Sequence, residues 1–175
     1  MTSPDRLCRL TLVLGGARSG KSRYAEELIK GAAPPWVYIA TAEALDDEMR
    51  ERIAHHRDRR DGDWRTVDAP RDLAGAISRA GADGRPILID CLTLWLSNTL
   101  LAEADVDEAC VELTAALSAS RGPIVAVSNE VGFGLVPETP LGRRFRDAQG
   151  RLNQQVAAVA DRVVLVAAGL PLTLK

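Results

Sequence analysis

The sequence predicts an α/β fold, in which a doubly wound and mostly parallel sheet carries helices on both faces. Five short runs are mainly apolar, without the polar alternation of a half-exposed strand, and they lie at residues 10–14, 36–40, 87–90, 124–128 and 162–166. Segments with helical spacing of apolar residues separate these runs, as in βαβ units. No internal repeat or linker is visible, so we expect residues 1–175 to form one domain.

The first of these strands leads directly into a glycine-rich turn. The turn reads Gly15, Gly16, Ala17, Arg18, Ser19, Gly20, Lys21 and Ser22, which fits the pattern G-x-x-x-x-G-K-[ST] between a buried strand and a helix. Its glycines allow backbone N–H groups to converge on phosphate oxygens, beside the positive end of the helix that follows. Lys21 would reach the terminal phosphates, and the Ser22 hydroxyl would be a ligand to Mg²⁺. The sequence therefore predicts a nucleotide-binding P-loop in a P-loop NTPase-like, RecA-like fold.

The first half of the chain continues with three helices and two strands. A helix over 22–31 places Tyr24, Leu28 and Ile29 on one face, and the prolines at 34–35 precede the strand 36–40. A second, highly charged helix is expected over 46–60. A short strand over 64–67 and a helix over 72–79 follow.

The second half alternates in the same way. The strand 87–90 is followed by 92–101, which could continue as strand or helix, although Asn98 and the acidic residues after it favour a helix. Helices are then expected over 107–119 and 141–160, around the strand 124–128 and a Gly/Pro loop over 132–140. The strand 162–166 and a short tail strand at 172–174 complete the sheet, and residues 1–8 are expected to form a flexible lead.

Composition narrows the class of protein. The chain is 46% hydrophobic and 26% charged with a formal net charge of −2, which provides no strong field toward nucleic acid or membranes. Its three cysteines have no metal-site or disulfide spacing, which favours a reducing cytoplasm. Neither a signal peptide nor an apolar run of about 18 residues is present, so we expect no membrane span.

Polar residues follow two of the buried strands. Asp90 ends the strand 87–90, where a carboxylate can hold the Mg²⁺ of a nucleotide, although a capping role for the next turn is the alternative. Asn129 and Glu130 end the strand 124–128 ahead of Gly132 and Gly134. The ends of parallel strands form the ligand-binding edge of such sheets, but a tight turn explains the two glycines equally well.

The only two histidines, His55 and His56, lie within the charged helix predicted over 46–60. They can be polar positions on a solvated face. Alternatively, one of them is a nucleophile toward a nucleoside phosphate, with the neighbouring arginines neutralising the leaving pyrophosphate. His56 continues the face of Met49 and Ile53, whereas His55 points about 100° away.

With these residues in view, the chain resembles the bifunctional adenosylcobinamide kinase/adenosylcobinamide-phosphate guanylyltransferases of cobalamin biosynthesis. The resemblance runs through GGARSGKSRYAEELI, YIATAEALDDEMRERIAHHRDRR, WRTVD, ILIDCLTLWLSN and VAVSNEVGFGLVPETPLGRRFRDAQGRLNQQVA. It implies phosphorylation of the aminopropanol hydroxyl of adenosylcobinamide by ATP or GTP. It also implies transfer of GMP from GTP, through a histidine, to adenosylcobinamide phosphate, and His56 matches that histidine better than His55.

The resemblance also implies the nucleotide contacts and the assembly. The contacts map onto the P-loop from Gly15 to Ser22 and onto Ala40, Thr41, Ala42, Arg57, Asp58, Arg59, Arg60, Asp68 and Asp90. Asp68 and Asp90 depart from the family pattern, in which both positions are glutamate, so each carboxylate here is one methylene shorter. The family further implies a homotrimer and a parallel sheet with one reversed edge strand.

Two other classes of protein would use the same P-loop. A P-loop switch protein would bind nucleotide and act through a partner, and a simple small-molecule kinase would phosphorylate without guanylyl transfer. Neither has a need for His56, so covalent labelling of a histidine by GTP separates both from the bifunctional enzyme.

Overall fold

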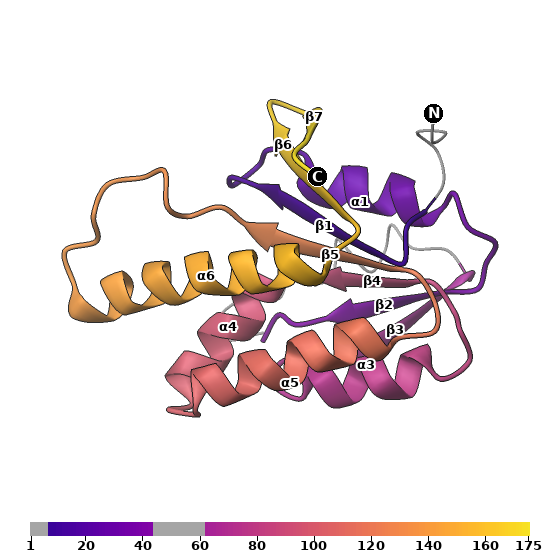
Figure 1. The fold of residues 1–175 in the computed structure, drawn as a ribbon, viewed down its shortest axis with the longest axis horizontal. Coiled ribbons are helices and arrows are strands. Elements are labelled where there is room, and N and C mark those ends of the chain that lie inside the picture. Colours follow the sequence, from indigo (N-terminus) through magenta and orange to yellow (C-terminus); the bar gives the residue numbers. More distant parts are fainter. Residues whose placement is uncertain (1–6, 44–61) are drawn as a thin grey trace.

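A seven-stranded sheet forms the centre of the computed structural model, which describes residues 7–43 and 62–175 (Figure 1). Its strand order is β3-β2-β4-β5-β1-β6-β7, and every neighbouring pair is parallel except β6 and β7. The strands are β1 (Leu10–Gly15), β2 (Trp36–Ala40), β3 (Trp64–Asp68), β4 (Ile87–Asp90), β5 (Ile124–Asn129), β6 (Arg162–Ala167) and β7 (Leu170–Thr173). The predicted α/β class and mostly parallel sheet are confirmed.

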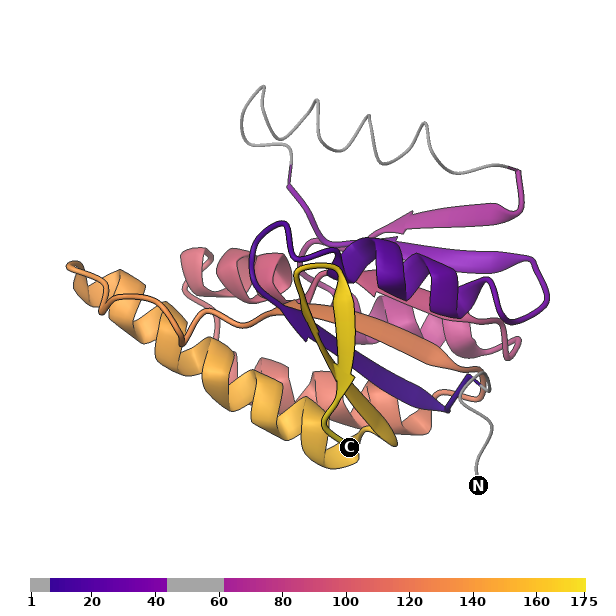
Figure 2. The same cartoon turned by 90° about the horizontal axis from the view of Figure 1, so that it is seen from above.

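The edge strands of the sheet differ from the central ones. β6 and β7 form an antiparallel pair at one edge, far from β3 at the other (Figure 2). β7 begins two residues before the predicted tail strand at 172–174 and ends one residue before it. The reason is the left-handed backbone at Ala168 and Gly169, which turns the chain directly after β6. The reversed edge strand is therefore confirmed.

Five helices connect these strands within the described residues: α1 (Lys21–Ile29), α3 (Leu73–Gly81), α4 (Leu92–Leu101), α5 (Val106–Ala119) and α6 (Pro140–Val159). Asp72, Asp105 and Thr139 accept hydrogen bonds from first-turn N–H groups and so fix the starts of α3, α5 and α6. The helix that the sequence favoured over 92–101 is confirmed as α4, with the same bounds. It is buried on nearly every side, so it lacks the one-sided apolar pattern that identifies a surface helix.

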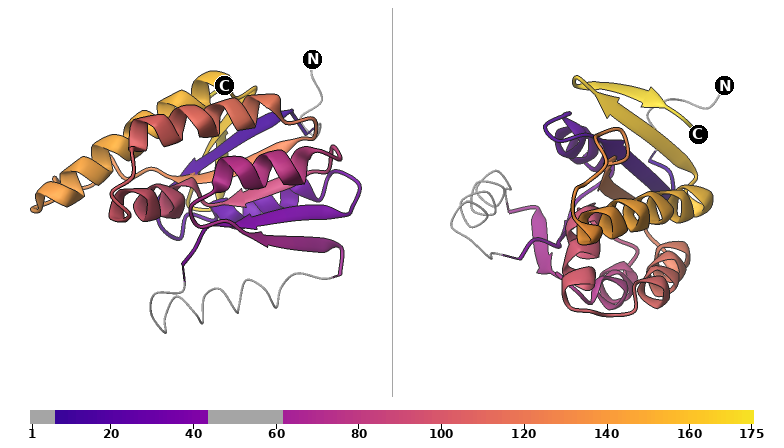
Figure 3. Two further views of the ribbon diagram at one scale, coloured as in Figure 1. Left: turned by 90° about the horizontal axis from the view of Figure 1, so that it is seen from below. Right: turned by 90° about the vertical axis from the view of Figure 1, so that its left-hand side faces the viewer.

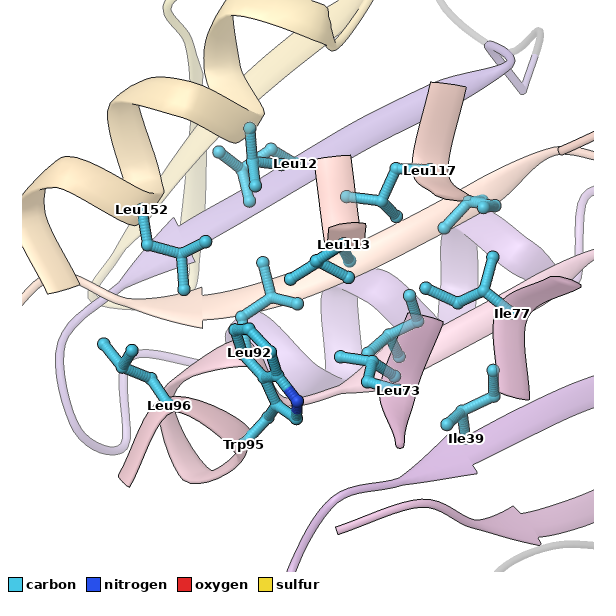
Figure 4. Packing of buried hydrophobic residues seen from close by; sticks show 14 of the residues in the cluster. Leu12, Ile39, Leu73, Ile77, Leu92, Trp95, Leu96, Leu113, Leu117 and Leu152 are labelled. Atoms are coloured by element: carbon cyan, nitrogen blue, oxygen red, sulfur yellow. The ribbon is translucent and has the colours of Figure 1, made fainter. Parts of the chain in front are cut away.

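The two faces of the sheet are covered unequally. Figure 3 places α1 on one face and α3, α4, α5 and α6 on the other. The four-helix face holds the larger apolar cluster, in which Leu113, Leu117 and Leu152 of α5 and α6 meet the strands (Figure 4). The α1 face holds a smaller cluster, in which Ala25 and Ile29 pack against Val13, Val125 and other strand residues.

The predicted helix over 46–60 and most of the predicted lead lie outside the described residues. Leu7 is described, and it packs against the cluster on the α1 face. No helix in residues 7–43 and 62–175 is long and apolar enough to cross a membrane. No disulfide joins Cys8, Cys91 and Cys110 in the described residues.

Candidate functional site

The turn between β1 and α1 requires its glycines for steric reasons. A Cβ on Gly15 would collide with the Ser19 hydroxyl and would lie 2.7 Å from the Val166 carbonyl oxygen. Gly20 has φ of +97°, a conformation that side chains disfavour, and its carbonyl accepts the Tyr24 N–H that starts α1. Gly16 faces open space, so this part of the loop is accessible to a ligand. The predicted loop therefore has the tight, open backbone of a phosphate cradle.

Lys21 and Ser22 occupy the first two positions of α1. The Lys21 ammonium donates a hydrogen bond to the Gly16 carbonyl at 3.0 Å, so it lies folded over the loop rather than out in solvent. The Ser19 hydroxyl is buried and has no hydrogen-bond partner in the described part of the chain, while the Ser19 carbonyl accepts the Gly169 N–H at 2.8 Å. The Ser19 hydroxyl oxygen is thus a buried polar atom of the loop that a bound ligand could reach with a hydrogen bond.

Asp90 ends β4 on the same face of the sheet as the P-loop. Leu88 and Val13 both belong to the α1-face cluster, and side chains two residues apart on a strand share a face, so Asp90 and Gly15 point to that side. The Tyr38 hydroxyl, from the same cluster, donates to Asp90 at 3.3 Å. The strand-end carboxylate is therefore aimed toward the P-loop face.

The pKa of the Cys91 thiol is affected by the charged groups around it. Burial and then the Asp90 carboxylate raise the pKa of Cys91 to about 11, whereas the backbone N–H groups of Leu94 and Thr93 and, to a smaller extent, the Lys21 ammonium lower it. One buried group thus feels both the P-loop lysine and the strand-end carboxylate. The site therefore combines a cation, a carboxylate and an open backbone loop.

The registers of β2, β3 and β4 align three predicted residues at the carboxyl edge of the sheet. Ala40 pairs with both Asp68 and Asp90, so these two carboxylates flank it on either side. Asp68 is exposed at the end of β3. The sequence resemblance gave these positions, and the sheet brings them to one edge together with Gly15.

Thr41 forms an internal joint rather than an open ligand group. Its hydroxyl donates to the Cys91 carbonyl at 2.7 Å and accepts the Cys91 N–H at 2.8 Å. The Asn98 side chain donates to the Thr41 carbonyl at 2.8 Å and to the Pro70 carbonyl at 3.0 Å. Thr41 therefore fixes the segments that follow β2 and β4, and Ala42 next to it is partly exposed at this edge.

A buried polar network behind β5 was missed by sequence reasoning. The Gln149 amide donates to Ser128 at 2.9 Å and to Asn153 at 3.0 Å, and Ser128 donates to Asn153 at 2.7 Å. Thr93 of α4 accepts the Asn129 N–H at 2.8 Å, and Asn153 donates to the Asn129 carbonyl at 3.0 Å. The signal that could have revealed this network is the presence of Thr93, Gln149 and Asn153 at buried positions of α4 and α6.

The loop after β5 forms the tight turn that its two glycines predicted. Glu130 accepts the Gly132 N–H at 2.7 Å and directly follows Asn129 at the carboxyl end of β5. Beyond it, Phe133 and Leu135 are 84% and 96% exposed. Arg143 of α6 donates to the Pro137 and Glu138 carbonyls at 3.0 and 2.7 Å, so this arginine anchors the loop.

Several predicted site residues lie outside the described residues. They are His55, His56, Arg57, Asp58, Arg59 and Arg60. In the described part of the chain no group of three His, Cys, Asp or Glu side chains forms a metal site. A Mg²⁺ ion on a nucleotide needs fewer protein ligands than that, because it keeps waters and phosphate oxygens. The hydroxyl of Ser22 and the carboxylate of Asp90 are oxygen donors of the type that Mg²⁺ prefers, so the donor set fits the ion.

The sheet order and the loop after β1 define a P-loop nucleotide-binding protein. Solved structures agree on the fold: the flagellar accessory protein FlaH from Methanocaldococcus jannaschii has a TM-score of 0.52 at 14% identity, over 95% of this chain and 78% of that one. An ATPase of the type III secretion system of pathogenic bacteria also has a TM-score of 0.52 at 14% identity, over 95% of this chain and 57% of that one. At this identity the likeness shows the fold alone.

Sequence comparison is more specific. The family model for cobinamide kinase / cobinamide phosphate guanyltransferase matches residues 11–174, so the chain belongs to this family. The bifunctional adenosylcobalamin biosynthesis protein CobU of Salmonella typhimurium is 44% identical, over 95% of this chain and 99% of that protein. The bifunctional adenosylcobalamin biosynthesis protein CobP of Pseudomonas aeruginosa is 47% identical, over 94% of this chain and 96% of that protein. CobU of Escherichia coli is 42% identical, over 95% of this chain and 99% of that protein.

Proposed function

We propose that this chain phosphorylates adenosylcobinamide and then converts adenosylcobinamide phosphate to adenosylcobinamide-GDP. The observation that carries the proposal is the family match over residues 11–174, supported by relatives 42–47% identical over nearly their whole length. The alternatives of a switch protein or a simple kinase have no comparable support.

The first reaction uses the site around the P-loop. Backbone N–H groups of 15–22 would bind the phosphates of ATP or GTP, and Lys21 would move from the Gly16 carbonyl to the terminal phosphates. Ser22 and Asp90 would hold Mg²⁺, which when bound neutralises phosphate charge. The aminopropanol hydroxyl then attacks the terminal phosphorus, and the nucleoside diphosphate leaves with the bond electrons.

The second reaction needs a nucleophile, which we assign to His56. Its imidazole would attack the α-phosphorus of GTP, forming an N–P bond while pyrophosphate leaves. A phosphate oxygen of adenosylcobinamide phosphate would then displace the imidazole from that phosphorus, which gives adenosylcobinamide-GDP and free histidine. The guanidinium groups of Arg57, Arg59 and Arg60 would neutralise the pyrophosphate. The remaining proposed nucleotide contacts are Ala40, Ala42, Asp58 and Asp68. Thr41 would act by positioning the segments that follow β2 and β4.

We further propose, from the resemblance, that the enzyme is a cytoplasmic homotrimer whose partners are corrinoid substrates and not nucleic acid. Sedimentation of the purified chain tests the trimer directly. A single species at the monomer mass would contradict it.

Covalent labelling tests the assignment of the histidine. The protein is incubated with GTP labelled at the α-phosphate, and we expect acid-labile, base-stable label on histidine, as for a phosphoramidate. His56→Ala should lose this label and all guanylyl transfer but still phosphorylate adenosylcobinamide, because that reaction needs no histidine. His55→Ala is the matched control and should keep both activities in part. Label that survives His56→Ala, or that maps to His55 in the unaltered protein, would contradict the assignment.

A further inference from the structure

Asn129 lies between the two parts of the candidate phosphate site, the P-loop and Asp90. Asn129 ends β5, the strand between β1 and β4, and it pairs in register with Gly15 of the P-loop strand. Asp90 pairs with Val127, two residues before Asn129. Because neighbouring strands are about 4.8 Å apart, Asn129 is a near neighbour of both the P-loop and the strand-end carboxylate.

Strand alternation directs this side chain to the face where nucleotide would bind. Val125 and Val127 belong to the α1-face cluster, so Asn129 points to the same face as Gly15 and Asp90. Ser128 points to the opposite face, into the network with Gln149 and Asn153. Two successive polar residues of β5 therefore have separate surroundings.

The backbone of Asn129 is fixed, whereas its side-chain oxygen is unpaired. Thr93 accepts its N–H at 2.8 Å, Asn153 donates to its carbonyl at 3.0 Å, and the next N–H, that of Glu130, bonds to the Gly15 carbonyl at 3.1 Å. Its Oδ1 is buried and has no hydrogen-bond partner among the residues that the structure describes. A buried, unpaired acceptor is unfavourable, and this one lies beside the P-loop strand, where a bound substrate can supply the missing donor.

We propose that the Asn129 side chain binds the acceptor hydroxyl of the corrinoid substrate beside the terminal phosphate. This rests on the proposed kinase function and adds a catalytic residue to it. Oδ1 accepts the hydrogen bond of the hydroxyl and aligns its oxygen for attack. The oxygen–phosphorus bond then forms, the bond to the nucleoside diphosphate breaks, and the hydroxyl proton leaves to solvent, because an amide does not act as a base. An acceptor is the group required, since the incoming hydroxyl is a donor.

The test compares Asn129→Ala and the isosteric Asn129→Asp with the unaltered enzyme. For Asn129→Ala we expect kcat for adenosylcobinamide phosphorylation to fall by about thirtyfold or more, with nucleotide Kd within about threefold and a cooperative unfolding transition. Asn129→Asp keeps an acceptor but places a negative charge by the phosphates, so its kcat should fall by at least as much. Asp105→Ala, at the far N-terminus of α5, is the control, and it should lower stability without changing kcat.

The outcomes separate this proposal from the proposed function. A folded variant with kcat within threefold of the unaltered enzyme would overturn the role of Asn129. Failure of both variants to fold would assign it a structural role and also overturn the proposal. If the unaltered protein does not phosphorylate adenosylcobinamide, the proposed function fails. Nucleotide hydrolysis, in which water replaces the hydroxyl, is then measured for both proteins: an unchanged rate in Asn129→Ala overturns the proposal, and a fall of about thirtyfold supports it.

Discussion

The two faces of the sheet divide stability and chemistry between them. The four-helix face buries the larger apolar cluster, and Gln149, Ser128 and Asn153 bond to one another behind it. The α1 face buries fewer apolar residues, yet it has the P-loop and Asp90. Of the three buried side-chain oxygens without a partner in the described residues, those of Ser19 and Asn129 lie at this site and that of Gln149 lies on the four-helix face. This difference indicates that substitutions on the α1 face should affect turnover, whereas those on the other face should affect the free energy of unfolding.

The largest effect is expected from Lys21→Ala. Lys21 donates to Gly16 in a partly exposed loop, so its loss should leave the unfolding transition nearly unchanged. Loss of its charge at the terminal phosphates should lower kcat for phosphorylation by about a thousandfold, or about 4 kcal/mol of transition-state stabilisation. Steady-state phosphorylation of adenosylcobinamide measures this, and Lys30→Ala at the exposed end of α1 is the control. Turnover within a few-fold of the unaltered enzyme would show that Lys21 has no such role.

The opposite result is expected for Leu113→Ala in α5. Leu113 is fully buried within the four-helix face, so its truncation should lower the free energy of unfolding by about 3 kcal/mol. The kcat of the folded protein should stay the same, because the site lies on the other face. Chemical denaturation gives the stability change. Val111→Ala on the same helix is the control, since Val111 is 64% exposed. A large fall in kcat with Leu113→Ala would break the division between the faces.

Sequence patterns predicted the fold well because its central strands are buried on both sides. The strands at 36–40 and 87–90 coincide with β2 and β4, since a short apolar run between turn residues has few other conformations. For α4 the sequence favoured a helix but also allowed a strand, because burial on nearly every side removes the periodicity that identifies a helix. Local sequence thus predicts a helix when only one of its sides is buried, and it predicts a strand when a short apolar run lies between turn residues.

The sequence predicted Asp90 and Asn129 as single residues at strand ends, but it predicted a group of site residues only where the chain carries them in one stretch. The P-loop from Gly15 to Ser22 is local, and so it was found directly. The network around Asn129 joins residues from α4, β5 and α6, and its partners come together only through the fold. That Asp90 lies on the same face of the sheet as the P-loop likewise follows only from the arrangement and register of the strands. The role of His56 stays a prediction, because that residue lies outside the described residues.

Asp90→Asn should have a smaller effect than Lys21→Ala. It keeps the side-chain shape and can still accept the hydrogen bond from Tyr38, but it removes the charge that would hold Mg²⁺. We expect nucleotide turnover to fall by more than tenfold, or about 1.4 kcal/mol or more, with the deficit largest at limiting Mg²⁺. Turnover as a function of Mg²⁺ concentration measures this. An unchanged rate at limiting Mg²⁺ would leave Asp90 as a cap for the turn before α4.

The smallest effect is expected from Asp105→Ala, which tests the division of the faces most finely. Asp105 accepts the N–H groups of Asp107 and Glu108 at 3.0 Å each, so its loss leaves two N-terminal donors of α5 to water. The free energy of unfolding should fall by about 1 kcal/mol, measured by denaturation. Asp105→Ser, which restores a capping oxygen, should recover most of that loss. If kcat also fell in Asp105→Ala and recovered in Asp105→Ser, the α5 end would be coupled to the site through the helix packing, and the two faces would not be independent.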